Sequence, residues 1–422
     1  MSPEIKFQSI LSPNQVMPWS SLSQTSVNAA DLSIVFPESI EQLSAVVQTC
    51  YEQRWRLLSC GQRTKLHWGA NHRLTNVDVV VSTARLNQLV EHWIDDFTTC
   101  VEAGMGFAEL QTKLQLHGQI WPVDTLYSHR ATEGGIIATA DGGSLRQRYG
   151  SVRDTVIGIE FVRYDGEVVK AGGRVVKNVA GYDLMKLMTG AYGTLGILSR
   201  INLRLYPIPT DSQTVVLSGA AEAIAEAALQ TRLRGITATA MDIIGTHKGV
   251  RLAGRFQGIT AGVQEQIERF QTIADEAGLT SEWVDDGFWA SLTDDLEAVE
   301  PDQIDPLLCK VGLLPTQLVP LLQQLDNNLT SNWLGRLHNA TGLGLLSFSM
   351  DGADLAELAN VLTVLRSHCT AHKGYLTVLQ APPSLSLEPW GYTGNALTMM
   401  KAIKQQFDPH GLLNPGRFVG GL

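Results

Sequence analysis

Long apolar runs are absent from this chain. No stretch approaches the ~18 consecutive apolar residues that a membrane-spanning helix needs, so we expect no membrane span. The first residues, MSPEIKFQSILSPNQVMPWS, lack a basic start followed by an apolar core, so we expect no secretory signal. Lysine and arginine form no cluster of the kind that follows a phosphate backbone, and the net charge is −10. Nucleic acid is therefore not expected as a partner.

Cysteine is scarce as well. The five cysteines are scattered and include no C-x-x-C pair: Cys50, Cys60, Cys100, Cys309 and Cys369. An odd, dispersed set excludes a disulfide framework and an iron–sulfur cluster bound by this chain alone. The composition is typical of a protein from a reducing compartment, and we expect a cytoplasmic location.

Several catalytic and nucleotide motifs are also missing. There is no G-x-x-x-x-G-K-[ST], no H-E-x-x-H and no G-x-S-x-G. The glycines near position 190 follow G-x-x-G-x-x-G and precede a predicted strand, so a Rossmann site fails on context. His368 and His372 lie four residues apart with no carboxylate at a suitable spacing, and we predict a solvated pair and no metal site.

What is present predicts two domains. A chain of 422 residues exceeds the ~250–300 at which single cores stop growing. Apolar periodicity predicts helices over 40–53 and 107–115, and strands over RLLSCG (56–61) and VDVVVST (77–83). Asp165-Gly166 joins two β-rich segments and predicts a hairpin, while 121–144 is predicted to be a loop.

The second half has a doubled pattern. Residues 211–285 follow the order β-α-β-β-α-β, and residues 307–380 repeat it, which predicts two ferredoxin-like units sharing one sheet. The acidic link between them is predicted to be loop with a short helix. The tail is predicted to be a helix that stops at Asp408-Pro409 and packs away from the repeat. The fold class is α+β.

Four segments rich in glycine stand out in the first half: 59–69, 132–144, 148–154 and 189–197. In the last of them, helix formers around Asp183–Met188 give way to Gly190, Gly193 and Gly196. Successive backbone N–H groups can hold a pyrophosphate, and glycine lets the backbone approach closely. Each loop alone could be an ordinary turn, but four within one half favour a phosphate-bearing ligand.

The order of motifs resembles a known family. GSVRDTVIGIEFV, then GGRVVKNVAGYDLMKLMTGAYGTLGIL, and finally DPHGLLNPGRF are similar to the FAD-binding superfamily of vanillyl-alcohol oxidase and p-cresol methylhydroxylase (PCMH). Within it, the chain resembles the FAD-binding E subunit of bacterial glycolate oxidase. The resemblance implies a two-part PCMH-type FAD-binding domain over 1–210, a ferredoxin-like cap domain over 211–385, and a segment over 386–422 that completes the FAD domain.

The resemblance also implies the cofactor contacts. The first loop would donate N–H groups to the pyrophosphate from Gly61, Gln62, Arg63 and Thr64. The G-G-x-x-A element would lie near the pyrophosphate and ribityl chain, with Gly134, Gly135, Ala138 and Thr139. The region flanking adenosine and flavin would comprise Tyr149, Gly150, Ser151, Val152 and Arg153. Backbone clearance at the flavin would come from Gly193, Gly196 and Ile197, and the returning tail would add Asn414 and Arg417.

Some roles stay open at this point. Arg417 could bring positive charge to the flavin or be a surface cation. Asp183 and Lys186 are interpreted as a surface pair. Cys60 is interpreted as a small buried hydrophobic residue. Relatives with covalently attached flavin carry histidine where Arg63 stands, so the resemblance implies noncovalent FAD. No catalytic residue can be named.

The implied activity is oxidation of glycolate, a 2-hydroxy acid, to glyoxylate within a complex. Its partners would be a D-type FAD subunit and an iron–sulfur subunit, and the complex could lie peripherally at a membrane. The histidine-rich metal element of D-type subunits is missing, which favours an electron-relay or structural flavin role for this chain. Two alternatives remain: a stand-alone flavin oxidase for another hydroxy acid or alcohol, and a flavin-free scaffold.

Overall fold

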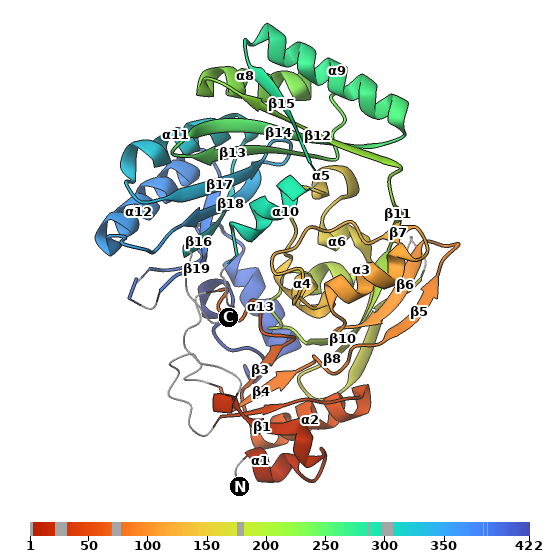
Figure 1. The fold of residues 1–422 in the computed structure, drawn as a ribbon. Coiled ribbons are helices and arrows are strands. Elements are labelled where there is room, and N and C mark those ends of the chain that lie inside the picture. The colour runs from red at the N-terminus through yellow and green to blue at the C-terminus, as the bar shows by residue number, and fades with distance from the viewer. Residues whose placement is uncertain are drawn as a thin grey trace. The chain divides into compact units, whose positions relative to one another are not determined.

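The computed structural model describes residues 3–21, 32–69, 77–174, 181–285, 287–297, 307–382, 384–385 and 387–422 (Figure 1). The chain forms two compact units. Unit 1 comprises residues 1–142, 150–208 and 393–422, and unit 2 comprises residues 143–149 and 209–392. The predicted α+β class is confirmed. Residues 175–180, which include the first four residues of the KNVAGYDL motif, lie outside the described residues.

Unit 1 begins with a four-stranded sheet of order β1-β2-β4-β3, in which β2, β4 and β3 are parallel. Its elements are α1 (Pro3–Phe7), β1 (Val16–Pro18), β2 (Ser33–Val35), α2 (Ile40–Gln53), β3 (Leu57–Cys60) and β4 (Val79–Ser82). Helix α2 begins and ends where the apolar pattern predicts. The Ser39 hydroxyl accepts a hydrogen bond from the Gln42 N–H and caps the helix. Val46 of α2 is buried in the same core as Leu57 and Val79.

A second, antiparallel sheet of unit 1 has the order β5-β6-β10-β8-β9. Its strands are β5 (Leu89–Trp93), β6 (Thr98–Glu102), β8 (Val156–Val162), β9 (Val168–Gly172) and β10 (Ile197–Arg204). The predicted hairpin at Asp165-Gly166 is confirmed as the β8–β9 connection, where Gly166 has φ +89°. A small pair of strands, β7 (Gln119–Ile120) and β11 (Tyr206–Pro207), is separate.

Short helices lie between the strands of the second sheet in sequence. They are α3 (Phe107–Gln115), α4 (Glu133–Thr139), α6 (Val152–Thr155) and α7 (Leu184–Met188), while α5 (Arg146–Tyr149) belongs to unit 2. Helix α3 has the predicted bounds. The prediction of a loop over 121–144 is wrong, because α4 lies within it. The Thr132 hydroxyl caps α4 by accepting from the Gly135 N–H, and Ile136 and Ile137 of α4 are buried in the core of this part of unit 1.

Unit 2 contains one eight-stranded sheet of order β15-β12-β14-β13-β17-β18-β16-β19. The first repeat comprises β12 (Asp211–Ser218), α8 (Ala221–Leu233), β13 (Ala240–Thr246), β14 (Gly249–Gly258), α9 (Thr260–Glu276) and β15 (Thr280–Val284). The second comprises β16 (Leu307–Gly312), α11 (Leu318–Asn328), β17 (Trp333–His338), β18 (Leu343–Phe348), α12 (Leu355–Ala371) and β19 (Tyr375–Gln380). The predicted doubled unit with a shared sheet is confirmed, and the β13–β17 pair joins the two repeats.

The two faces of this sheet are covered differently (Figure 1). Met241 and Ile243 of β13 are buried in the core that α8, α9, α11 and α12 share with the sheet. The alternate residues Ala240 and Ile244 pack in a smaller core with Trp289 of α10 (Gly287–Asp294). Helix α10 is the short helix predicted for the acidic link.

The chain returns to unit 1 through α13 (Leu397–Phe407), which stops at Asp408-Pro409 as predicted. The segment beyond it lies beside β3. The Leu57 N–H donates to the Leu412 carbonyl at 2.8 Å, and the Asn414 N–H donates to the Leu57 carbonyl at 2.8 Å. Across the described part of the chain, no helix has the length and apolar character that crossing a bilayer requires.

Candidate functional site

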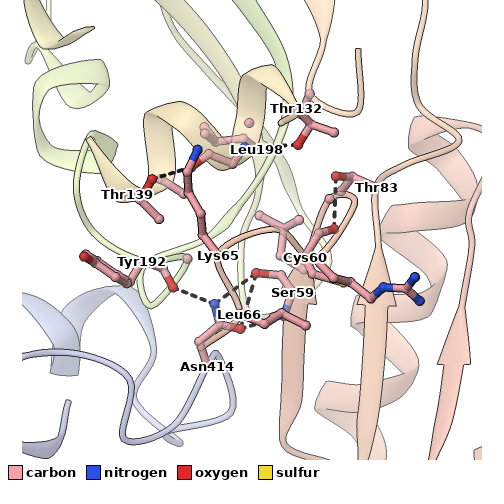
Figure 2. Close-up of a pocket in the computed structure, with 18 of the residues that line it drawn as sticks. Ser59, Cys60, Lys65, Leu66, Thr83, Thr132, Thr139, Tyr192, Leu198 and Asn414 are labelled. Atoms are coloured by element: carbon pink, nitrogen blue, oxygen red, sulfur yellow. Dashed lines mark hydrogen bonds between the residues drawn. The ribbon is translucent and has the colours of Figure 1, made fainter. Parts of the chain in front are cut away.

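Unit 1 contains a pocket that is open to solvent, and Figure 2 shows many of the residues that line it. Its walls come from residues 59–66, from α4 and the residue before it, from residues 188–198, and from the tail. Thirteen predicted residues line it: Gly61, Gln62, Arg63, Thr64, Gly134, Gly135, Ala138, Thr139, Gly193, Gly196, Ile197, Asn414 and Arg417. The fold therefore brings four distant segments to one place.

The other five predicted residues do not line this pocket. Tyr149 ends α5 in unit 2. Ser151 caps α6, since its N–H and its hydroxyl both donate to the Asp154 carboxylate, at 2.8 and 2.6 Å. Gly150, Val152 and Arg153 flank this cap. Their contact with adenosine or flavin stays a prediction.

The loop after β3 offers the pocket unpaired donors. Among the described residues, the N–H groups from Gly61 to Thr64 donate to no protein atom. Arg63 holds a left-handed conformation with φ +68°. A side chain on Gly61 would collide with the Thr132 hydroxyl, so only glycine fits there. Consecutive free N–H groups suit an anionic oxygen-rich ligand.

Helix α4 does not offer such a run of amides. The Gly134 N–H donates to the Ala103 carbonyl at 2.8 Å, and the Gly135 N–H faces the Thr132 hydroxyl at 3.4 Å. A Cβ on Gly134 would lie 2.9 Å from both the Cβ and the carbonyl oxygen of Ala103. This glycine therefore lets the helix approach the end of β6, and α4 contributes a packed wall to the pocket.

The glycines at 193 and 196 serve the packing of the protein itself. A Cβ on Gly193, which has φ +71°, would lie 2.6 Å from the Ser59 hydroxyl. A Cβ on Gly196 would lie 2.7 Å from the Phe161 ring and 2.9 Å from the Met188 methyl. The space that a Cβ would take at these two positions is occupied by protein side chains, and contact of either glycine with the flavin stays a prediction.

Asn414 connects three of the pocket segments (Figure 2). Its Oδ1 accepts from the Ser59 N–H at 2.7 Å, and its Nδ2 donates to the Ser59 hydroxyl at 3.0 Å and to the Tyr192 carbonyl at 2.6 Å. Asn414 and Tyr192 both have positive φ, +45° and +54°. Non-glycine residues held in this region gather at functional sites.

Arg417 is a buried cation in the pocket wall. Only 6% of it is exposed, so the surface-cation alternative is wrong. Its Nη2 donates to the carbonyls of Lys65, Leu66 and Trp68 at 3.0–3.2 Å, whereas its Nε has no partner among the described residues. Burial lowers the pKa of Arg417 from its usual value, but a guanidinium stays charged in proteins.

Lys65 lines the pocket too, although sequence analysis missed it. Its Nζ lies 2.8 Å from the Asp141 carboxylate and 3.0 Å from the Thr125 hydroxyl. The same carboxylate accepts from the Leu126 N–H at 2.9 Å. Lys65 is therefore neutralised within the protein, and Arg63 and Arg417 remain as the cations of the pocket. The only signal in the sequence was the position of Lys65 beside the predicted phosphate loop.

Cys60 lines the pocket but does not offer a thiolate nucleophile near neutral pH. Burial raises the pKa of the Cys60 thiol to about 11, so it stays protonated near neutral pH. Asp183 and Lys186 form the expected pair, 3.1 Å apart and 45% exposed. Within the described ranges, no three His, Cys, Asp or Glu side chains are grouped to hold a metal ion.

Two sequence families match the chain. Residues 32–172 match the family described as FAD binding domain, and residues 389–418 match FAD linked oxidases, C-terminal domain. Together they contain the first loop, α4 and the tail residues of the pocket.

Three relatives illustrate the similarity. The chain is 33% identical over 220 residues to mitochondrial D-lactate dehydrogenase [cytochrome] of Arabidopsis thaliana, covering 52% of this chain and 38% of that protein. It is 27% identical over 425 residues to D-2-hydroxyglutarate dehydrogenase of Xanthomonas citri pv. viticola, covering 92% and 89%. It is 30% identical over 184 residues to glycolate oxidase subunit GlcD of Bacillus subtilis, covering 44% and 39%. The chain thus spans less than half the length of the first and third relatives.

Solved structures share the fold. Alkyldihydroxyacetonephosphate synthase superposes with a TM-score of 0.74 at 16% identity, covering 98% of this chain and 85% of that chain. p-Cresol methylhydroxylase with bound substrate superposes with a TM-score of 0.72 at 15% identity, covering 98% and 96%. These two likenesses, at 15–16% identity, show a shared fold, while residues 32–172 and 389–418 carry the sequence patterns of an FAD binding domain and of the C-terminal domain of FAD linked oxidases. The two matches support FAD as the cofactor of the chain.

Proposed function

We propose that the pocket of unit 1 holds FAD noncovalently, with the pyrophosphate against the loop from Gly61 to Thr64. The free N–H groups of this loop carry the proposal, since they line the pocket and donate to no protein atom among the described residues. The unpartnered Nε of Arg417 adds a second observation in favour of an anionic ligand. The residues present therefore fit the cofactor.

Each pocket segment has its own task in this proposal. The first loop binds the phosphates, and Arg417 supplies buried positive charge without competing carboxylates. Asn414 and α4 fix the walls of the pocket, so the loop already has its binding conformation before the cofactor arrives. FAD, when bound, supplies the acceptor for a hydride, and the chain contributes orientation and electrostatics.

We further propose that the substrate is a small 2-hydroxy acid. The D-lactate and D-2-hydroxyglutarate dehydrogenases and the glycolate oxidase subunit among the relatives support this class. Glycolate is our specific candidate, with the chain as the E-type subunit beside a D-type FAD subunit and an iron–sulfur subunit. This complex would be cytoplasmic or peripheral at a membrane.

Within that complex, we propose an electron relay for this chain. Among the described residues that line the pocket there is no histidine and no carboxylate, so the pocket wall supplies no ordinary base for the substrate hydroxyl. Oxidation of the substrate would then take place on the D-type partner.

The first experiment is a visible spectrum of the purified chain, repeated on the supernatant after acid precipitation. Flavin bands near ~370 and ~450 nm that enter the supernatant are expected for noncovalent FAD. A colourless chain that takes up no added FAD would contradict the proposal and favour the scaffold alternative. Flavin retained in the pellet would contradict noncovalent attachment.

The second experiment addresses substrate and role. Anaerobic glycolate, D-lactate, D-2-hydroxyglutarate and, as control, L-lactate are each mixed with the isolated flavoprotein. The relay predicts no bleaching by any of them until the D-type partner is added. Bleaching of the isolated chain would instead support a stand-alone oxidase, and the most effective acid would identify its substrate.

A further inference from the structure

Lys404 is a buried cation outside the pocket lining. It lies on α13 and is 9% exposed. Its Nζ donates three hydrogen bonds: to the Thr194 carbonyl at 2.8 Å, to the Leu413 carbonyl at 2.9 Å and to the Asp408 carboxylate at 2.6 Å. An ammonium has three donors, so this one is fully used by the protein.

Its counter-ion is fixed in turn. The Asp408 carboxylate, which is 2% exposed, accepts from the Leu412 N–H at 3.0 Å and from the Leu413 N–H at 2.7 Å. Both carboxylate oxygens therefore hold the turn that follows α13 through hydrogen bonds to its backbone. The hydrogen bonds on both partners fix the geometry of this buried ion pair. Removal of one partner would leave an uncompensated buried charge.

The two carbonyl acceptors of Lys404 belong to two pocket segments. Thr194 lies between Gly193 and Gly196, which line the pocket, and Leu413 directly precedes Asn414. The Lys404 ammonium thus links segment 190–196 to the tail, because it donates a hydrogen bond to one backbone carbonyl of each. Asn414 joins the same two segments on the pocket side, through the Tyr192 carbonyl.

We propose that Lys404 is a positioning residue for FAD: its ammonium sets the spacing between segment 190–196 and the tail, and thereby the affinity of the pocket for the cofactor. The inference deepens the proposed function and rests on it. Nothing in the pocket lining identifies Lys404, which acts through two backbone carbonyls.

The test compares Lys404→Met with Lys186→Met in the full-length chain. Lys186 is a matched control, because it forms a half-exposed ion pair on α7, whose Met188 also lines the pocket. FAD is titrated into each apo-chain at a temperature where far-UV circular dichroism shows it folded. We expect Lys404→Met to weaken FAD binding about tenfold or more, with an altered visible circular dichroism of the bound flavin, and Lys186→Met to change neither. Equal affinities in both variants and the wild type would overturn the inference.

The double variant Lys404→Met/Asp408→Asn separates spacing from charge balance. If the two carbonyl contacts set the pocket, removal of the counter-charge does not restore FAD affinity. Restored affinity would mean that the loss came from the unpaired Asp408, and the positioning role would be wrong.

If Lys404→Met does not fold, amide hydrogen exchange of the wild type tests the positioning role of Lys404 instead. We expect added FAD to slow amide exchange in 190–196 and in 411–417 together, besides 61–65. Protection confined to 61–65 would overturn the inference. A wild-type chain that binds no FAD would instead refute the proposed function, and exchange of 190–196 in apo Lys404→Met against apo wild type would then measure the spacing role directly.

Discussion

At the scale of single residues, Glu133 is a buried acidic group of unit 1. It is fully buried at the start of α4, between Thr132 and Gly134, which line the pocket. Neither carboxylate oxygen has a hydrogen-bond partner among the described residues. Desolvation raises the pKa of Glu133 well above its usual value, and Lys65 only partly offsets this. The side chain is therefore held as a neutral acid far above the pH at which an exposed one ionises.

Replacement of Glu133 by glutamine should make stability less dependent on pH. The folded state keeps the Glu133 proton above the unfolded pKa of 4.5, so the free energy of unfolding falls as pH rises from there toward the folded pKa. Each unit between the two pKa values contributes about 1.4 kcal/mol. Denaturant unfolding at about pH 5 and about pH 7.5 measures the slope. We expect a smaller fall in Glu133→Gln, and no such change in the exposed control Glu109→Gln; equal slopes in all three would contradict the assignment.

Asn414 gives a second prediction at this scale. Asn414→Ala removes the acceptor of the buried Ser59 N–H and places alanine at φ +45°. We expect a loss of about 2–4 kcal/mol in the free energy of unfolding, because buried polar groups lose partners and the backbone is strained. Asn328→Ala, at an exposed site on α11, should change stability by less than about 0.5 kcal/mol. Similar values for the two variants would show that Asn414 does not hold the segments together.

At the scale of elements, α4 is a helix that is stabilised by tertiary contacts more than by its own sequence. Its sequence, EGGIIAT, combines two glycines with β-branched residues and has low intrinsic helix propensity. It is helical because Thr132 caps it and the side chains of Ile136 and Ile137 are buried.

The two glycines of α4 should respond differently to alanine. Gly134→Ala places a methyl group 2.9 Å from the Ala103 backbone, which cannot move away easily, and should cost about 1–3 kcal/mol. Gly135→Ala meets only the Thr132 hydroxyl, at 3.2 Å, and should be neutral or stabilise by up to about 1 kcal/mol. Thermal unfolding of the two apo-variants side by side tests this. A larger loss at Gly135 would contradict the packing described here.

The elements that sequence analysis predicted well carry their signal locally. Helices α2 and α3 have the predicted bounds because apolar residues at helical spacing face a core and a cap or a glycine precedes them. The doubled unit was visible because each repeat has the same order of periodic segments. Helix α4 was missed because its stability comes from tertiary contacts, which composition does not reveal.

The site was predictable only in part for a related reason. The loop from Gly61 to Thr64 and the tail, which line one pocket, could be located through the resemblance. Lys65 and Tyr192 were missed because their roles depend on contacts with Asp141 and Asn414 that no short pattern encodes. Ser59 and Asn414 are 355 positions apart in the chain and in direct contact in the fold.

At the scale of the whole molecule, the chain passes between the two units more often than a simple two-domain order requires. The segment 143–149 leaves unit 1 directly after α4 and belongs to unit 2. The Ser144 hydroxyl donates to the Asp242 carboxylate at 2.9 Å and accepts from Arg336 Nη2 at 2.9 Å, and Arg336 Nε donates to the same carboxylate at 2.7 Å. A residue from the FAD-binding half of the sequence therefore completes a buried ion pair of unit 2.

Ser144→Ala should consequently weaken unit 2 although it lies in the sequence of the first half. We expect a loss of about 1–2 kcal/mol, because the buried ion pair loses a shared hydroxyl. Amide exchange in β13 and β17 should become faster, while β3 and β4 keep wild-type rates. Ser367→Ala, an exposed serine on α12, is the control within unit 2. Faster amide exchange confined to unit 1 would show that segment 143–149 stabilises unit 1 and not unit 2.

The pairing of the tail with β3 has a consequence for biosynthesis. A ribosome releases residues in order, so Leu57 and the loop from Gly61 to Thr64 emerge long before Leu412 and Asn414 exist. The pocket wall is complete only after the tail segment has been synthesised. A chain that terminates before Leu412 carries this loop but not the residues that hold it in place.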